Sequence, residues 1–164
     1  MPQKIASLTL RPREPADDPF IVSLSERVFS AYAHDPVAAM RSMLEERAGD
    51  AAVAELGGSR VGFALVACQR LPRDFGPWRR PVTAHLDAIA VRPESHGRGI
   101  GRGLLDHAID LAHARGAVSI SLLTAEANIR ARRLFESAGF MAFLRQENSY
   151  ARGQAGLVML KALT

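Results

Sequence analysis

Apolar and polar positions in the first part of the chain are spaced as in a short strand followed by two helices. Leu8 and Leu10 alternate with polar neighbours, which predicts a strand. A helix is expected to begin at Asp17, because apolar residues then recur three or four positions apart. A second helix with the same spacing is expected from Pro36 to about Arg47. The predicted order here is strand, helix, helix.

The middle of the chain predicts a hairpin and then a loop. Residues 51–68 have the pattern of two strands around Gly57 and Gly58, a pair of residues typical of tight hairpin turns. Residues 69–81 are rich in proline, arginine and aromatic residues and are long for a hairpin loop. They are expected to form a surface loop, with the border of a substrate opening as the alternative.

The second half of the chain alternates strands with helices and ends in two strands. In order, the expected elements are a strand over 82–91, a helix ending near Arg115, a strand over 118–124, a helix over about 128–138, and closing strands near 140–147 and 155–162. Such alternation is typical of an α/β fold.

Composition points to one globular domain spanning residues 1–164. The chain is 48% apolar and 23% charged, which is ordinary for a globular protein. Its formal net charge is +4, its arginines are spread along the chain, and aromatic residues make up 6%. A nucleic-acid binder usually concentrates basic and aromatic residues on one face, so a solvated surface and no nucleic-acid partner are expected.

The chain carries no obvious signal for a membrane or for secretion. No apolar run approaches the roughly 20 residues that span a bilayer, and the first residues lack a secretory pattern. The lone Cys68 lies in an apolar run and is expected to be a small core residue. A cytoplasmic location without a membrane partner is therefore expected.

The stretch ESHGRGIGRGLL, at 94–105, links a predicted strand to a predicted helix through glycines. The start of a helix has N–H groups without partners and a partial positive charge from the helix dipole. Glycine lets the backbone adopt a positive φ and lets a phosphate approach closely. Arg98 and Arg102 add positive charge. The stretch therefore predicts an anion site rather than a plain tight turn.

Spacing decides which anion site fits best. The dinucleotide pattern G-x-G-x-x-G fails from Gly97, Gly99 or Gly101, and no GKS or GKT follows as a P-loop requires. The stretch HGRGIG, at 96–101, resembles the pyrophosphate loop Q/R-x-x-G-x-G/A of the GNAT N-acetyltransferases, with His96 in place of Gln or Arg.

A second motif strengthens this resemblance. NIRARRLFESAGF, at 128–140, is similar to the second cofactor segment of that family, N-x-x-A-x-x-L-Y-E-x-x-G-F. Asn128, Ala131 and Leu134 occupy matching positions, and Phe135 stands where many members have tyrosine. The two motifs occur in the family's order, so the resemblance covers residues 82–143.

The resemblance implies a fold, a cosubstrate and a set of binding residues. The fold would be a mixed, mostly antiparallel sheet of six to seven strands, with a central splayed parallel pair and about four flanking helices. Acetyl-CoA would be the cosubstrate, no metal would be needed, and a homodimer would not be unusual. The implied cofactor-binding residues are Ile89, Ala90, Val91, His96, Gly97, Arg98, Gly99, Ile100, Gly101, Arg102, Asn128, Ala131 and Phe135. Asn128 is also a good helix N-cap, and both roles are compatible.

Acyl transfer to an amine needs a group that takes a proton. An amine with a pKa of about 10.4 is mostly charged at pH 7, and neutralising it costs roughly 4.6 kcal/mol. His85 and Asp87 lie two positions apart on one predicted strand, and histidine titrates near neutral pH. AHLDAIAV, at 84–91, also resembles a segment of arylalkylamine N-acetyltransferases. His85 is the expected base with Asp87 assisting; a structural histidine–aspartate pair is the alternative.

The proton donor to the leaving thiolate is less obvious, because Phe135 cannot donate a proton. Among the tyrosines, Tyr150 is the first candidate and Tyr32 the second, each with an ordinary packing or rim role as the alternative. Water or the amine itself could also supply the proton. The sequence thus predicts an acetyl-CoA-dependent N-acetyltransferase acting on a primary amine, either a small molecule or a peptide or protein. The alternative is a non-catalytic acyl-CoA-binding or regulatory domain.

Overall fold

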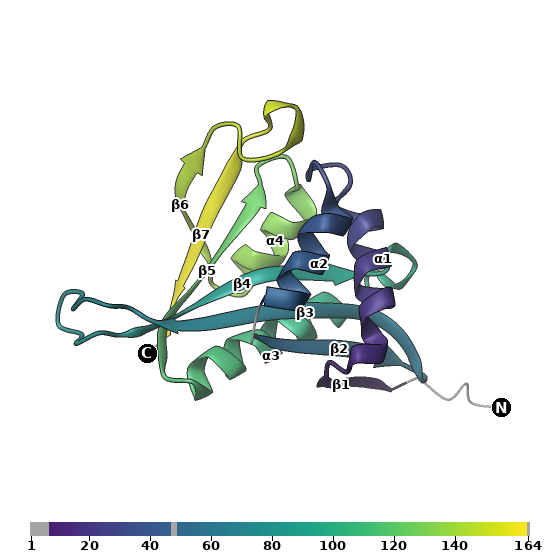
Figure 1. The fold of residues 1–164 in the computed structure, drawn as a ribbon, viewed down its shortest axis with the longest axis horizontal. Coiled ribbons are helices and arrows are strands. Elements are labelled where there is room, and N and C mark those ends of the chain that lie inside the picture. The colour runs from purple at the N-terminus through teal and green to yellow at the C-terminus, as the bar shows by residue number, and fades with distance from the viewer. Residues whose placement is uncertain (1–6, 47–48, 164) are drawn as a thin grey trace.

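The computed structural model describes residues 7–46 and 49–163, which form one mixed sheet with helices on both faces (Figure 1). The strands are β1 (Leu8–Pro12), β2 (Asp50–Leu56), β3 (Ser59–Arg70), β4 (Val82–Val91), β5 (Ala117–Ala125), β6 (Met141–Gln146) and β7 (Gly156–Ala162). The α-helices are α1 (Asp18–Phe29), α2 (Pro36–Glu46), α3 (Ile100–Ala114) and α4 (Ile129–Ser137). Three short 3₁₀ helices lie at Pro15–Asp17, Pro93–Ser95 and Ala151–Gly153.

The order of strands across the sheet is β1-β2-β3-β4-β5-β7-β6. Every neighbouring pair is antiparallel except β4 and β5, which run parallel in the middle of the sheet. The mixed, mostly antiparallel α/β fold expected from the sequence is therefore confirmed. The position of β7 between β5 and β6 was not part of that expectation.

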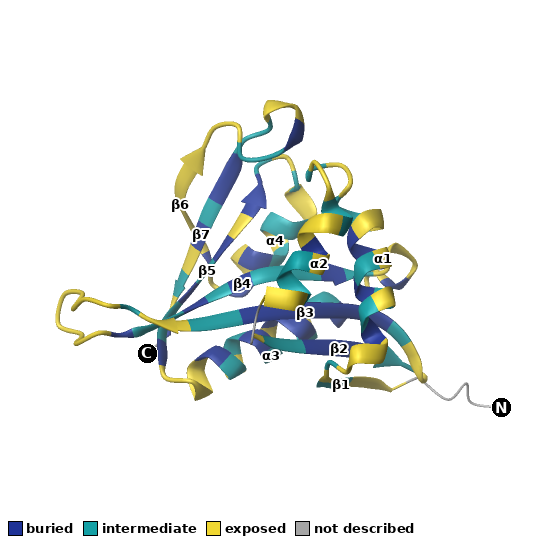
Figure 2. Cartoon of the chain, in the orientation of Figure 1, coloured by how far each residue is buried: buried dark blue, intermediate teal, exposed yellow. Residues whose placement is uncertain are grey.

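Two apolar clusters pack on opposite faces of the sheet. The larger one joins α3 and part of α4 to the sheet, with Leu104, Leu105 and Ile120 fully buried. The smaller one joins α1 and α2 to β2, β3 and β4 around Phe63. Figure 2 shows the buried centres of the strands, while β6 at the sheet edge is exposed along its length. No helix of the described residues is long and apolar enough to cross a membrane.

A bulge in β4 separates two registers of the sheet. Leu65 of β3 pairs with Ala88, but the next residue, Val66, pairs with Leu86, so Asp87 is the extra residue. The bulge changes which side chains face each helix layer: Leu86 packs with the α3 cluster and Ala88 with the α1 cluster.

The parallel strands β4 and β5 separate next to this bulge. Their pairing begins at Val82 with Ala117 and ends at His85 with Ser121. Beyond that pair each strand continues without the other, to Val91 and to Ala125. The expected splayed parallel pair is therefore present, and the opening lies at the carboxyl ends of both strands.

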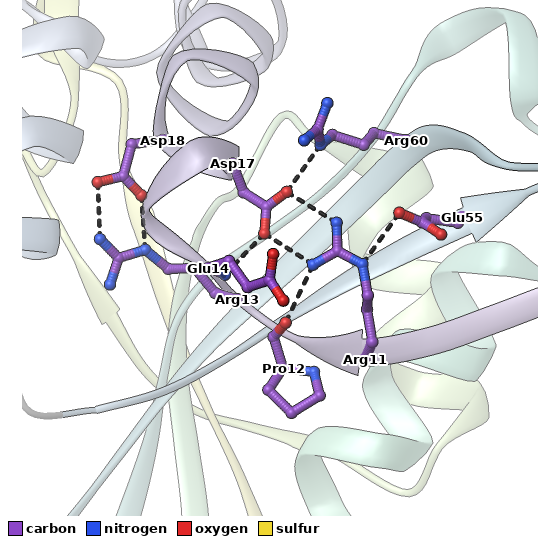
Figure 3. Close-up of polar contacts among 8 residues, drawn as sticks. All are labelled: Arg11, Pro12, Arg13, Glu14, Asp17, Asp18, Glu55 and Arg60. Carbon is purple, nitrogen blue, oxygen red and sulfur yellow. Dashed lines mark hydrogen bonds and ion pairs between the residues drawn. The ribbon is translucent and has the colours of Figure 1, made fainter.

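Buried Asp17 fixes the start of α1 against the sheet (Figure 3). Its carboxylate accepts hydrogen bonds from Arg11 Nη1 and Nη2, both at 2.8 Å, from Arg60 Nε at 2.7 Å, and from the Glu14 backbone N–H at 2.7 Å. Hydrogen bonds from the Arg11 guanidinium lower the pKa of Asp17 far below its ordinary range. Arg11 lies on β1 and also donates to Glu55 of β2, so the network joins α1 to the first three strands.

Candidate active site

A cavity of about 580 Å³ occupies the opening between β4 and β5. Two of its walls are formed by residues 86–91 of β4 and 122–125 of β5. The part lined by the glycine turn at the start of α3, residues 96–101, and by the start of α4 is called the far end. The part lined by α1, α2 and Tyr150 is called the near end. Ile89, Ala90 and Val91, expected to face a ligand, are among the lining residues. No residue of the loop 69–81 lines it; that loop projects as the tip of the β3–β4 hairpin (Figure 1).

The glycine turn leads directly into the first turn of α3. Gly97 and Gly99 have φ angles of 78° and 75°, and Gly99 is the N-cap of the helix. A Cβ added at either glycine would meet no protein atom within 4 Å, so the space above the turn is open. The N–H groups of the first helical turn have no acceptor within the helix and carry the positive end of its dipole. These two properties fit an anionic ligand such as a pyrophosphate.

The basic and histidine side chains of the turn differ in what they contact. His96 Nε2 lies 3.2 Å from the Val91 carbonyl oxygen, which links the turn to the end of β4. Arg102 lines the cavity and donates to Asp106 at 2.9 Å and to the Ser137 carbonyl at 3.2 Å. Arg98, by contrast, is not among the lining residues. Of the two arginines predicted from the sequence, only Arg102 therefore reaches the cavity.

The start of α4 contributes the opposite side of the far end. The Asn128 side chain accepts a hydrogen bond from the Ala131 N–H at 3.2 Å, so it caps the helix, and Asn128 also lines the cavity. Phe135 lies one helical turn after Ala131, is 4% exposed, and packs edge-to-face on Phe140. Phe135 also lines the cavity, where it offers an apolar surface and no proton.

His85 and Asp87 lie at the point where β4 and β5 separate. His85 Nε2 is 4.0 Å from Asp87 Oδ1, and His85 Nδ1 is 3.0 Å from Ser121 Oγ on β5. The Asp87 side chain is 7% exposed and lines the cavity, whereas the His85 side chain is 46% exposed and lies beside it. The two side chains are thus adjacent, as expected, with histidine towards solvent and aspartate towards the cavity. Their chemical roles stay predictions.

Both candidate tyrosines lie at the near end of the cavity, and their rings pack edge-to-face with centroids 6.3 Å apart. Burial raises the pKa of Tyr150 to about 12, so its hydroxyl stays protonated at neutral pH. The loop that carries Tyr150 is attached to the end of α1: the Ala151 N–H donates to the Tyr32 carbonyl, and Arg152 donates to the Ala31 carbonyl. The segments that carry the two rings are therefore joined by one backbone hydrogen bond and one from the Arg152 side chain.

The described residues contain no group of three or more His, Cys, Asp or Glu side chains that could hold a metal ion. Cys68 is partly buried, and burial raises the pKa of its thiol. Its thiol is thus poorly suited to act as a nucleophile at neutral pH.

Most of the chain matches the model of a known protein family. The model of the Acetyltransferase (GNAT) family matches residues 18–140, which is most of the chain. The chain belongs to the GNAT acetyltransferase family. The family match includes the bulged strand β4, the glycine turn and α4.

Individual GNAT relatives resemble shorter parts of the chain. A mycothiol acetyltransferase of Beutenbergia cavernae is 41% identical over 59 residues, 36% of this chain and 20% of that protein. A [ribosomal protein bS18]-alanine N-acetyltransferase of Salmonella typhimurium is 41% identical over 71 residues, 43% of this chain and 48% of that protein. The matches thus span between a fifth and about half the length of these relatives.

The fold of the chain is shared over nearly its whole length with solved GNAT structures. A NatC complex bound to Gag peptide and CoA matches with a TM-score of 0.81, covering 96% of this chain and 99% of that chain at 18% identity. At such low identity the match shows the fold alone.

Two features of this GNAT site were not found by reading the sequence. Ser121 contacts His85 across the last paired position of β4 and β5, and only the register of the parallel pair reveals that contact. The apolar wall that α1 and α2 give to the cavity was also missed. Its residues have ordinary helical spacing in the sequence, which does not separate core from cavity lining.

Proposed function

We propose that this chain is an acetyl-CoA-dependent N-acetyltransferase that transfers an acetyl group directly to the nitrogen of a primary amine. The acceptor would be a small molecule or the amine of a peptide or protein. The observation that carries the proposal is a single cavity that is lined both by a glycine turn at a helix N-terminus and by Asp87, whose side chain lies next to His85. Family membership supports it, as does the CoA bound in the NatC complex with the same fold.

The far end of the cavity suits the anionic part of acetyl-CoA. Gly97 and Gly99 leave space that any larger residue would fill, and the first turn of α3 supplies N–H donors there. Backbone groups of residues 89–91, beyond the last β4–β5 pair, would bind the extended pantetheine arm as an added strand does. Asn128, the N-cap of α4, and Ala131 would border the arm from the other side. When bound, acetyl-CoA supplies the acetyl thioester.

The near end of the cavity suits the acceptor amine. Overall, an N–C bond forms, the C–S bond breaks, and one proton moves from the amine nitrogen to the thiol sulfur. His85 would take the amine proton, directly or through water, because its ring is partly in solvent and beside the cavity. Asp87 would hold the ammonium form of the acceptor and favour the charged imidazole. Ser121 would orient the ring through its Nδ1 atom.

Replacing His85 tests the assignment of the base. His85→Gln keeps a polar side chain but removes the group that titrates, so kcat/KM is expected to fall by about 100-fold at pH 7, within the usual range for a general base. Steady-state kinetics from pH 6 to 9 measure the effect. His113→Gln is the matched control, because His113 is an exposed histidine in the last turn of α3, at the opposite end of that helix from the glycine turn. Full retention of kcat/KM by His85→Gln across this range would contradict the assignment.

Tyr150 is the proposed donor to the leaving thiolate, because it lines the cavity and stays protonated. Tyr150→Phe removes the hydroxyl, so kcat is expected to fall by about 10-fold, while KM for acetyl-CoA changes little. Since the pKa of Tyr150 is raised to about 12, the parent should not lose activity through its ionisation as pH rises from 6 to 9. Tyr32→Phe is the control on the neighbouring ring. Equal turnover of Tyr150→Phe and the parent would leave water or the amine as the proton source.

A free-thiol release assay tests the proposed function as a whole. Acetyl-CoA is incubated with the protein and a panel of arylalkylamines, polyamines, amino acids and peptides, and CoA release is followed for each. Amine-dependent release supports the proposal. Release at the rate of spontaneous hydrolysis with every amine would contradict it.

A second candidate function is a non-catalytic acyl-CoA-binding domain. Phe135 favours it, because a buried phenylalanine stands where many family members carry a tyrosine. This candidate predicts tight CoA binding by calorimetry together with no thiol release for any amine in the panel.

A further inference from the structure

The near end of the cavity has an almost uniformly apolar wall. This wall comes from α1, α2 and the segment between them, and its apolar lining residues include Val28, Phe29, Ala33, Ala39, Met40 and Met43. The hydroxyls of Tyr32 and Tyr150 are the polar groups beside it, and neither side chain is a carboxylate or a cation. An acceptor in this part of the cavity therefore meets mostly carbon atoms.

Charge is distributed unevenly along the cavity. Among the described lining residues the only carboxylate is Asp87, at the point where the strands separate. The arginines that line the cavity, Arg102 and Arg130, both come from the far end, at the starts of α3 and α4. Arg152 lies close to the near end but donates to the Ala31 carbonyl and is not a lining residue. The acceptor end thus offers one negative charge and no lining arginine or lysine.

We infer that the acceptor of this chain is a monoamine borne on an apolar body, with no carboxylate beside the amine. The inference rests on the proposed function and names its acceptor class. One ammonium group is matched by Asp87, and each CH₂ group buried on the apolar wall should raise affinity about 4-fold. A carboxylate or a second ammonium would lose its hydration there without an opposite charge to replace it.

Two sources of such an amine share this chemistry. One is a small arylalkylamine; the other is a peptide N-terminus whose first side chain is apolar and whose carboxyl group is in an amide bond. Free amino acids carry a carboxylate next to the amine, and polyamines carry further ammonium groups along an aliphatic chain. Both of these latter classes are expected to be poor acceptors.

Matched amines test the inference on the parent protein. 2-Phenylethylamine and phenylalanine differ by the carboxylate alone, so their kcat/KM values, expressed per neutral amine, isolate its effect. We expect 2-phenylethylamine to be the better acceptor by at least about 100-fold, since a buried carboxylate without a paired cation loses its hydration and gains no ion pair in return. Spermidine and the capped peptides Phe-Gly-Gly-amide and Asp-Gly-Gly-amide complete the panel. The faster of 2-phenylethylamine and Phe-Gly-Gly-amide identifies the source.

The outcomes separate this inference from the proposed function. Phenylalanine, spermidine or Asp-Gly-Gly-amide as the best acceptor would overturn the inference while leaving the N-acetyltransferase function in place. If no amine in the panel increased thiol release above spontaneous hydrolysis, both the function and the inference would be contradicted. Selectivity for the uncharged apolar bodies would support both.

A charge added to the wall tests its location. Ala39 is exposed on α2 and lines the cavity, so a longer side chain is tolerated there without burying charge in the core. Ala39→Arg should reduce the preference for 2-phenylethylamine over phenylalanine about 10-fold, a modest change because Asp35 lies one turn earlier. Ala39→Met, which adds a long unbranched side chain without charge, should keep the preference of the parent. An unchanged preference in Ala39→Arg would place the acceptor's carboxylate elsewhere and overturn the assignment of this wall.

Discussion

Gly99→Val is expected to weaken CoA binding by about 1,000-fold, or about 4 kcal/mol. The φ of 75° at Gly99 is strained for a β-branched residue, and a Cβ there projects into open space where the pyrophosphate would lie. Displacing the anion by the width of a side chain removes two or more charge-assisted hydrogen bonds to backbone N–H groups, each contributing roughly 1.5–3 kcal/mol. Isothermal titration calorimetry with CoA measures the loss directly, and thiol release should fall with it.

Gly116→Val provides a matched control at the other end of the same helix. Gly116 has a φ of 77°, and a Cβ there would also meet no atom within 4 Å. The two variants thus carry similar backbone strain, but only Gly99 is next to the cavity. Gly116→Val should lose stability and keep CoA affinity within about 2-fold. Equal loss of affinity in both variants would mean that strain, not occupation of the anion site, caused the effect.

Asp17→Asn is expected to destabilise the protein by about 3 kcal/mol, because it leaves two arginines facing a buried side chain that no longer carries charge. The value is at the low end of the range for broken buried pairs, since Arg60 is 40% exposed and can be rehydrated. At this chain length the change should lower Tm by about 6–12 °C. Urea unfolding at pH 7, followed by circular dichroism, gives the free energy of unfolding.

Asp18→Asn is the control, because Asp18 pairs with Arg13 at the surface, with both side chains partly exposed. Asp18→Asn should lower the free energy of unfolding by no more than about 1 kcal/mol.

The pH dependence of stability gives a second test of Asp17. The folded-state pKa of Asp17 is depressed, so the stabilisation from its ionised carboxylate is present above the ordinary pKa of about 3.9 and is lost as pH falls further. The difference between parent and Asp17→Asn should therefore be constant from pH 7 to about 5 and shrink below pH 4. A difference that stays constant down to pH 3 would contradict a depressed pKa at Asp17.

The order of elements could be predicted from the sequence because each one has a local signal. Glycines mark the β2–β3 turn and the end of α3 near Gly116, and apolar spacing separates helices from strands. The place of β7 between β5 and β6 has no such signal, because strands adjacent in sequence usually pair directly with each other and here the last strand also pairs with β5. The bulge at Asp87 has no sequence signal either, because it depends on how β4 pairs with β3.

The candidate site shows the same difference between features set by local sequence and features set by long-range packing. The positions of Gly99 and Asn128 at the starts of two helices could be predicted because a short motif encodes that local backbone geometry. The apolar wall could not, because it exists only where α1 and α2 pack beside the opening between β4 and β5. Arg98 and Arg102 both fit the motif by spacing, but Arg102 lines the cavity and Arg98 does not.

The position of β7 also sets an order of assembly during synthesis. A ribosome makes β6 before β7, yet β6 pairs with the rest of the sheet only through β7. Until β7 emerges, β6 therefore lacks its pairing partner, and its backbone N–H and C=O groups are open. Its apolar residues Met141 and Phe143 remain exposed even in the complete fold. The loop that carries Tyr150 joins β6 to β7, and it contacts the backbone of residues 31 and 32. The tyrosine side of the cavity therefore depends on residues that are made after the glycine turn and after the His85–Ser121 contact.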